Sequence, residues 1–144
     1  MRLKIPRIGI DAAVESVGTS PDGAMDVPQN LDDVAWFNLG PRPGAVGSAV
    51  IDGHSGWSHG IPAVFDNLYT IQKGDTILVQ DQNGITTTFV VRDVKTYDPK
   101  ANASAVFTSS DGKTHLNLIT CTGPWSAIQK THVSRLVVFS DMEK

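Results

Sequence analysis

The feature that most constrains the fold of this chain is its series of short segments rich in β-branched residues. The seven segments are 3–10, 12–18, 48–54, 75–82, 85–98, 115–121 and 133–140. Turn signals such as SPDGA and QNG separate them, and helical periodicity is scarce. Strands this short and numerous must close into a barrel or pack as two sheets to protect their edges. The sequence therefore predicts an all-β barrel or sandwich.

Three local features refine this prediction. The stretch TILVQDQNGITTTFVV predicts a hairpin that turns at Asn83-Gly84, since both residues tolerate positive φ. Two segments, 30–37 (NLDDVAWF) and 61–69 (IPAVFDNLY), are interpreted as short helices. We expect these helices to lie on the outside of the β-structure.

Length and charge exclude several classes of protein. The 144 residues suit a single domain, 1–144, and no linker or repeat divides them. A net charge of −3 without a basic cluster argues against a nucleic-acid partner. No apolar stretch approaches the roughly 18 residues that span a bilayer, and the start lacks the apolar core of a signal peptide. We expect either a cytosolic protein or one whose anchor lies outside this sequence.

The chain has one cysteine, Cys121, directly after the strand-like run LNLIT and before a Thr-Gly-Pro turn. A single cysteine excludes an internal disulfide and a Cys-rich zinc site. The segment before this strand has no acidic cluster, so we expect no calcium site, no other metal and no cofactor. A thiol at a strand end beside a loop is well placed for nucleophilic chemistry if a base favours its thiolate.

Histidine is the expected base, and the chain has four. His54 ends the apolar strand SAVID within DGHSGW, a setting similar to that of Cys121. His115 enters the cysteine strand six residues earlier, about 20 Å away in an extended chain, and is a poor partner. His59 suits a solvated loop, and His132 stays an alternative.

Arg135 lies within the apolar run SRLVVF, where it must face solvent or serve a partner. Its guanidinium could hold a developing oxyanion while Cys121 attacks a carbonyl and His54 protonates the leaving amine. Each residue also has a structural alternative. A lone cysteine can be a small buried side chain, and the other two can be solvated surface residues.

The motifs around these residues resemble the sortases, the cysteine transpeptidases of Gram-positive cell surfaces. LNLITC is similar to the family's T-L-x-T-C, with Asn117 in place of the first threonine, and Arg135 stands directly before LVVF. VIDGH supplies the family's histidine context. IPRIGIDAAV and IPAVFDNLYTIQKGDTILV resemble further family motifs, so the likeness covers nearly the whole chain. The absence of long appendages resembles the small class D to F members.

This resemblance implies an eight-stranded β-barrel and a reaction. Cys121 would cleave an LPxTG-type sorting signal between Thr and Gly, forming a thioacyl enzyme. His54 would be the general acid and base, and Arg135 the oxyanion stabiliser. An amine, from a cell-wall precursor or a pilin lysine, would resolve the intermediate. Thr120 would help to shape the substrate contacts.

Further substrate contacts are expected on both sides of the site. Trp57 and Trp125 each lie within four residues of a catalytic candidate and would wall the groove, or else cover the core edge. By the family resemblance, the loop before the cysteine strand shapes the signal's binding pocket. Within this loop Ala105, Val106 and Phe107, together with Ala101, would form an apolar floor.

Asp52 is unusual two places before the histidine. In an extended strand it shares a face with His54, and its carboxylate would favour the imidazolium form. A surface aspartate turned to water is the alternative.

Two other functions stay open: a sortase-fold hydrolase or protease, in which water replaces the amine, and a catalytically silent peptide-binding module. The family implies a cell-surface protein with an extracellular catalytic domain, held in the membrane only through an anchor outside this sequence.

Overall fold

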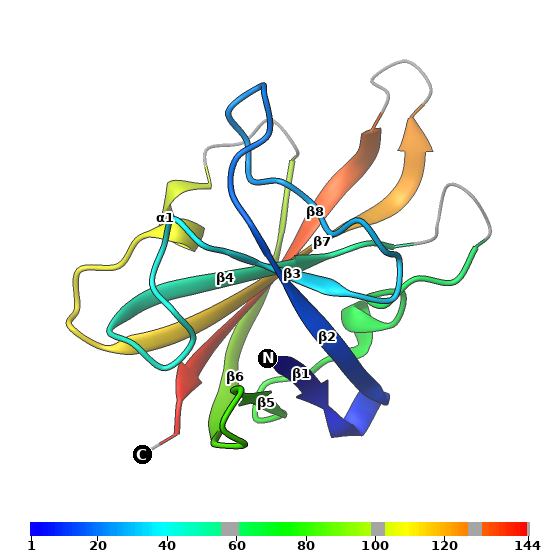
Figure 1. Ribbon diagram of the computed structural model, residues 1–144. Helices are drawn as coiled ribbons and strands as arrows, with labels where there is room; N and C mark the ends of the chain where they lie inside the picture. Colours follow the sequence, from blue (N-terminus) through cyan, green and yellow to red (C-terminus); the bar gives the residue numbers. More distant parts are fainter. Residues whose placement is uncertain (56–60, 99–102, 127–130, 144) are drawn as a thin grey trace.

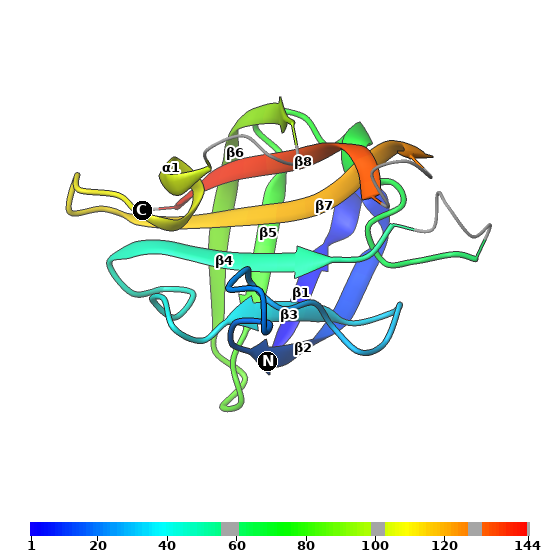
Figure 2. The same cartoon turned by 90° about the horizontal axis from the view of Figure 1, so that it is seen from above.

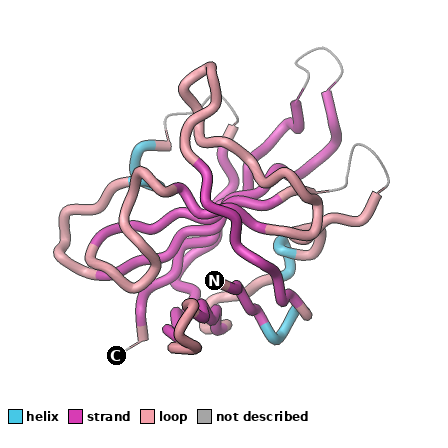
Figure 3. Tube along the Cα trace, in the orientation of Figure 1, coloured by secondary structure: helices cyan, strands magenta, loops and turns pink. Residues whose placement is uncertain are grey.

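The computed structural model describes residues 1–55, 61–98, 103–126 and 131–143, with the backbone alone at 121–126 and 131–133. Its strands curl around a shared interior (Figures 1 and 2). Helical segments are few and short beside the strands (Figure 3). No helix within these ranges is long and apolar enough to cross a membrane.

The elements in chain order are β1 Arg2–Ile5, η1 Pro6–Ile8, β2 Ile10–Val17, β3 Val34–Phe37, β4 Gly47–Gly53, η2 Leu68–Thr70, β5 Thr76–Gln80, β6 Thr86–Tyr97, α1 Ser104–Phe107, β7 Thr114–Ser126 and β8 Thr131–Met142. The strands form a closed barrel in the order β1-β2-β3-β4-β7-β8-β6-β5. Pairs β2/β3 and β4/β7 are parallel, and the other pairs are antiparallel. This architecture confirms the eight-stranded all-β barrel.

Alternation along the strands creates two apolar clusters. The larger fills the barrel and includes Leu116 and Leu118 of β7 with Phe65 from the segment after β4. The smaller lies outside the barrel, where Val106 of α1 packs against Val50 and residues of β8. Figure 2 shows α1 on the outside of the barrel beside β8. The outer face of β4, β7 and β8 is therefore partly covered by the segment that precedes β7.

The predicted hairpin is confirmed. Strands β5 and β6 pair antiparallel, and the turn between them has Gly84 at φ 80°. The carboxylate of Asp81 accepts the backbone N–H of Asn83 at 2.8 Å, which organises the turn.

Four sequence-based elements are corrected. The Thr-Gly-Pro stretch expected as a turn after Cys121 lies within β7, where the pairing with β8 shifts register between Thr122 and Trp125. Segment 30–37 is no helix: a turn leads into β3, Val34–Phe37, because Val34 and Ala35 are buried between neighbouring strands. Segment 61–69 contains turns and only the beginning of the 3-10 helix η2. The single strand expected at 3–10 is divided by Pro6, which begins η1 and lacks the N–H that a continuous ladder needs.

Candidate active site

Backbone register brings His54, Cys121 and Arg135 to one level on neighbouring strands. Cys121 of β7 stands opposite Arg135 of β8, and Thr120 stands opposite Gly53 of β4. His54 directly follows Gly53 and Cys121 directly follows Thr120, so both lie one residue beyond the last pair of β4 and β7. Because neighbouring strands lie about 4.8 Å apart, the three backbone positions span roughly 10 Å. The predicted catalytic residues thus form one row, which we call the catalytic row.

This row belongs to the outer face of the barrel. Leu116 and Leu118 are inside, whereas Ile119 packs in the outer cluster. With a period of two, the position of Cys121 belongs to the same set as Ile119. Strand β8 follows the same alternation, since Val137 is in the outer cluster and Arg135 precedes it by two.

Thr120 fixes the contact between β4 and β7 immediately before the catalytic row. Its side chain is 4% exposed, and its hydroxyl donates to the carbonyl oxygen of Gly53 at 2.9 Å. The hydrogen bond ties the two residues that precede His54 and Cys121. Thr120 therefore acts on the geometry of the site from inside the barrel; the expected substrate contact stays a prediction.

Gly53 is required by close packing. A Cβ atom on Gly53 would lie 2.6 Å from Cδ2 of Phe65, well inside van der Waals contact. The backbone N–H of Phe65 donates to the carbonyl oxygen of His54 at 3.0 Å. Because Gly53 has no side chain, the buried ring of Phe65 packs against the end of β4, directly before His54.

A backbone carbonyl orients the imidazole of His54. Its Nε2 lies 2.7 Å from the carbonyl oxygen of Pro28, which can only accept, so Nε2 carries the hydrogen. This leaves Nδ1 as the nitrogen that can accept a proton. The segment after Pro28 is held by Glu15, whose carboxylate accepts the N–H groups of Gln29 and Asn30 at 3.1 and 3.4 Å. The sequence patterns gave no signal for this contact, because a carbonyl is present at every residue.

Asp52 lies on the outer face one step behind the catalytic row. It pairs with Ala35 on one side and with Ile119 on the other. Burial raises the pKa of this carboxyl to about 8, against the opposing attraction of Arg135. Its Oδ1 is buried and has no hydrogen-bond partner within the described residues. Below about pH 8 most Asp52 is neutral, so the expected charge support for an imidazolium would act only above that pH.

The three predicted floor residues of α1 have different surroundings. Val106 is fully buried, and its carbonyl oxygen accepts the Nδ2 hydrogen of Asn117 at 2.7 Å. Phe107 meets the ring of Phe37 edge-on, with centroids 5.5 Å apart. Ala105 borders a polar cavity on the same face. Val106 holds the helix to the sheet, and an apolar floor for substrate stays a prediction.

Other predicted residues fall elsewhere. Trp57 and His59 lie outside the described residues, as does Ala101. The backbone of Trp125 pairs with that of His132, and their side chains are outside the description. His115 contacts two carboxylates at the far end of β7 and takes no part in the catalytic row.

No group of three or more His, Cys, Asp and Glu side chains within the described ranges is arranged to hold a metal ion. The chemistry that the row offers is that of a thiol, an imidazole and a guanidinium.

Comparisons with known proteins identify relatives that share this fold. The family profile described as the sortase domain matches residues 3–143. Sortase C-1 from Actinomyces oris is 23% identical over 99% of this chain and 73% of its own, with a TM-score of 0.77. Sortase A from Corynebacterium diphtheriae is 23% identical over 99% and 60%, with a TM-score of 0.75.

A sortase D5 transpeptidase from Clostridium perfringens is 18% identical over 99% of this chain and 78% of its own, with a TM-score of 0.72. No curated protein matches the chain by sequence. These structures carry the names of classes A, C and D, and at this level of identity they show the shared fold and do not separate the classes.

Proposed function

The chain belongs to the sortase family, and we propose that it is a cysteine transpeptidase that acts on a sorting-signal peptide of the LPxTG type. The observation that supports the proposal is the catalytic row: Cys121 on β7 pairs with Arg135 on β8, and His54 directly follows Gly53 of β4, which pairs with Thr120. A silent binding module would not need these three residue types at one level.

In the first half of the reaction, the thiolate of Cys121 attacks the scissile carbonyl carbon of the signal. The carbonyl electron pair moves to oxygen, and the guanidinium of Arg135 stabilises the resulting oxyanion. The oxyanion collapses, the C–N bond breaks, and His54 gives a proton to the departing amine. The product is a thioester between Cys121 and the new carboxyl-terminal residue of the substrate.

In the second half, an amine attacks the thioester carbon and loses a proton to His54. The C–S bond then breaks, a new amide forms, and Cys121 returns as the thiolate. A cell-wall precursor or a pilin lysine would supply the amine. The family further suggests a catalytic domain displayed on the cell surface and attached to the membrane by a segment outside this sequence. The class D to F resemblance stays a prediction.

Mass spectrometry after incubation with an LPxTG-type peptide tests the proposal, with and without triglycine as the amine. We expect cleavage between Thr and Gly, and a ligated product that depends on the amine. The product should vanish in Cys121→Ala and fall about 100-fold or more in Arg135→Ala.

Arg2→Ala is the matched control, because Arg2 is exposed on β1 and pairs only with the exposed Asp11 in the described structure. Cleavage without ligation would favour the hydrolase alternative. A panel of signal peptides that yields neither a thioester adduct nor cleavage would contradict the proposal and favour a silent module.

A further inference from the structure

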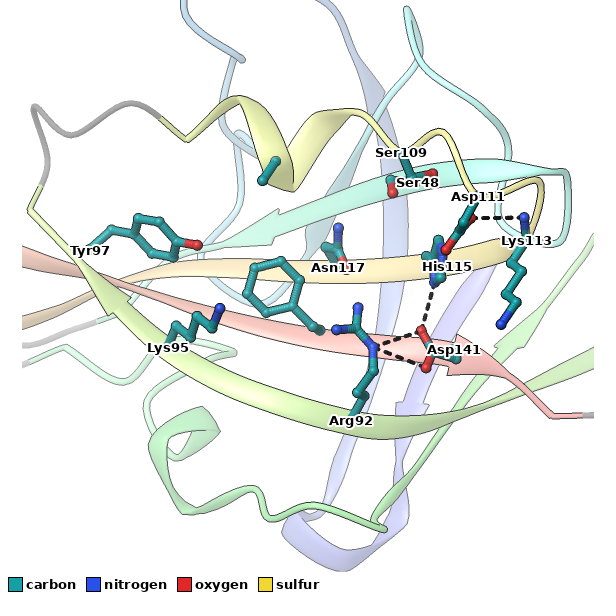
Figure 4. Close-up of a pocket in the computed structure, with 12 residues that line it drawn as sticks. Ser48, Arg92, Lys95, Tyr97, Ser109, Asp111, Lys113, His115, Asn117 and Asp141 are labelled. Carbon is teal, nitrogen blue, oxygen red and sulfur yellow. Dashed lines mark hydrogen bonds and ion pairs between the residues drawn. The ribbon is translucent and has the colours of Figure 1, made fainter.

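A polar cavity of about 410 Å³ opens on the outer face of the barrel, and one of its lining residues, Tyr97, stands opposite Arg135 in the pairing of β6 with β8. It lies between β6 and the segment that joins α1 to β7, with β7 and β8 as its floor (Figure 4). Its lining consists of Ser48, Arg92, Lys95, Tyr97, Ala105, Ser109, Asp111, Lys113, His115, Asn117, Phe139 and Asp141. Ten of these twelve residues are polar or charged, which suits a hydrophilic ligand.

Two cations converge on one aromatic ring in this cavity. The guanidinium carbon of Arg92 and Nζ of Lys95 each lie 5.6 Å from the ring centroid of Phe139. Figure 4 shows the side chains of Arg92, Lys95 and Tyr97 at one end of the cavity. Positive charges beside a hydroxyl donor attract an anion, and such donors suit the oxygens of a phosphate.

The acidic residues at the other end of the cavity already have partners among the described residues. Both ring nitrogens of His115 contact carboxylates, with Nδ1 2.6 Å from Asp141 and Nε2 2.7 Å from Asp111. Arg92 also donates to Asp141, at 3.0 and 3.1 Å. Lys95 faces the carboxylate of Asp93 at 3.8 Å, and Lys113 is a third basic residue of the lining.

The floor of the cavity offers an unused acceptor. Asn117 is 1% exposed and its Nδ2 donates to the carbonyl oxygen of Val106. Its Oδ1 has no hydrogen-bond partner within the described part of the chain. If the oxygen and nitrogen of the Asn117 amide were exchanged, Oδ1 would face the carbonyl oxygen of Val106. The orientation with Nδ2 toward that carbonyl is therefore required. This acceptor is itself shielded from solvent, so a ligand hydroxyl reaches it only when the side chains around it move.

We propose that this cavity binds a small phosphorylated polyol or sugar. The phosphate contacts Lys95, Arg92 and the hydroxyl of Tyr97, and a ligand hydroxyl donates to Oδ1 of Asn117. An anion without a hydroxyl group brings no donor for Asn117. An uncharged polyol brings no phosphate for Arg92 and Lys95. The same chemistry occurs in a free metabolite and in a phosphoglycerol lipid headgroup, and the experiment separates these sources.

Titration of the ¹⁵N-labelled protein with glycerol 3-phosphate, followed by NMR, tests the proposal. We expect saturable shifts of the backbone amides of Arg92, Lys95 and Asn117, with a dissociation constant in the millimolar range or below. Inorganic phosphate should bind about tenfold more weakly, because it lacks the second group, and glycerol should not bind. Co-sedimentation with phosphatidylglycerol vesicles, against phosphatidylcholine vesicles, tests the lipid source.

Lys95→Gln should weaken binding about tenfold, and Tyr97→Phe should weaken it to a lesser degree. Lys73→Gln is the control, since it removes the same charge from an exposed residue that does not line the cavity. Equal binding by Lys95→Gln and Lys73→Gln, or no saturable shifts with glycerol 3-phosphate, would overturn the proposal. Equal affinity for phosphate and glycerol 3-phosphate would overturn the proposed hydrogen bond between a ligand hydroxyl and Asn117. Because Cys121→Ala should bind normally, the result is independent of the proposed transpeptidase activity.

Discussion

Asp52 gives the protein a carboxyl group whose protonation differs between the folded and the unfolded chain. Its pKa is about 8 in the folded state, mainly because of burial, and 3.8 is the ordinary value. The folded protein therefore binds more protons between these values, and stability falls as the pH rises from about 4 to about 8. Asp52→Asn removes this loss. We expect the variant to gain roughly 2–5 kcal/mol over the wild type at pH 8 and almost nothing at pH 4.

Urea unfolding at pH 4, 6 and 8 measures the effect. Asp32→Asn is the matched control, because Asp32 is exposed and lies in a neighbouring loop. A difference between Asp52→Asn and the wild type that stays constant with pH would show that burial does not perturb this carboxyl.

The hydroxyl of Thr120 leads to a second prediction for a single residue. Thr120→Val keeps the shape but removes the donor to the carbonyl oxygen of Gly53. We expect a loss of about 1–2 kcal/mol in the free energy of unfolding, because that carbonyl loses a buried partner. The kcat for signal cleavage should also fall, since β4 and β7 carry His54 and Cys121.

Thr120→Ser, which restores the hydroxyl, should recover kcat even if the lost methyl group costs some stability. If Thr120→Val and Thr120→Ser have the same kcat, the hydrogen bond does not set the geometry of the site.

Residues with a local motif were predictable, and residues that act through the backbone were not. His54, Cys121 and Arg135 were predicted because each stands in or beside an apolar segment in a recognisable context, and their catalytic roles stay predictions. Pro28 acts through its carbonyl oxygen, a group that every residue has, so no side-chain pattern marks it. The burial of Asp52 depends on residues brought close by β2 and β3, which the sequence does not place.

At the scale of elements, the end of β4 depends on the packing of Gly53 against Phe65. Gly53→Ala would bring a methyl group to 2.6 Å from the buried ring. We expect a loss of about 1–3 kcal/mol from overpacking, together with slower catalysis from a displaced His54. Gly18→Ala is the control, since the nearest atom to its added Cβ is 3.8 Å away. Thermal unfolding measures the difference between the two variants.

Adding Phe65→Leu to Gly53→Ala provides a double-mutant cycle. The smaller side chain should relieve part of the clash, so the two changes together should cost less than the sum of their separate effects. Simple additivity would contradict direct contact as the cause.

The elements that the sequence missed share one physical cause. Segment 30–37 begins with residues that can cap a helix, but here the side-chain amide of Asn30 donates to Asp33 at 3.1 Å within a turn. The same residue types stabilise turns and helix starts, and only the partners of Val34 and Ala35 decide between them. Strands with their own alternation, such as β7, were predictable because both of their faces are specified by sequence.

For the whole molecule, the early strands of the barrel support a site whose other residues come from β4, β7 and β8. Glu15 on β2 accepts the N–H groups of Gln29 and Asn30, and the neighbouring Pro28 orients His54. Each oxygen of the carboxylate serves one of the two N–H groups. Glu15→Gln keeps a single acceptor and turns an amide N–H₂ toward the other backbone donor. The position of the His54 imidazole thus depends on Glu15 of β2, which is three strands away from Cys121 of β7 in the barrel.

We expect Glu15→Gln to loosen this segment and to slow alkylation of Cys121 by iodoacetamide several-fold near neutral pH, because a misplaced imidazolium stabilises the thiolate less well. The rate should recover at high pH, where any thiol ionises without help, and the melting temperature should change little. Asp11→Asn is the matched control, since Asp11 lies on the same strand and pairs only with the exposed Arg2 among the described side chains. Identical alkylation profiles for the two variants would show that the Glu15 contact does not reach the thiol. A uniform decrease at every pH would point instead to altered access, because only a change in thiolate population disappears as the pH rises.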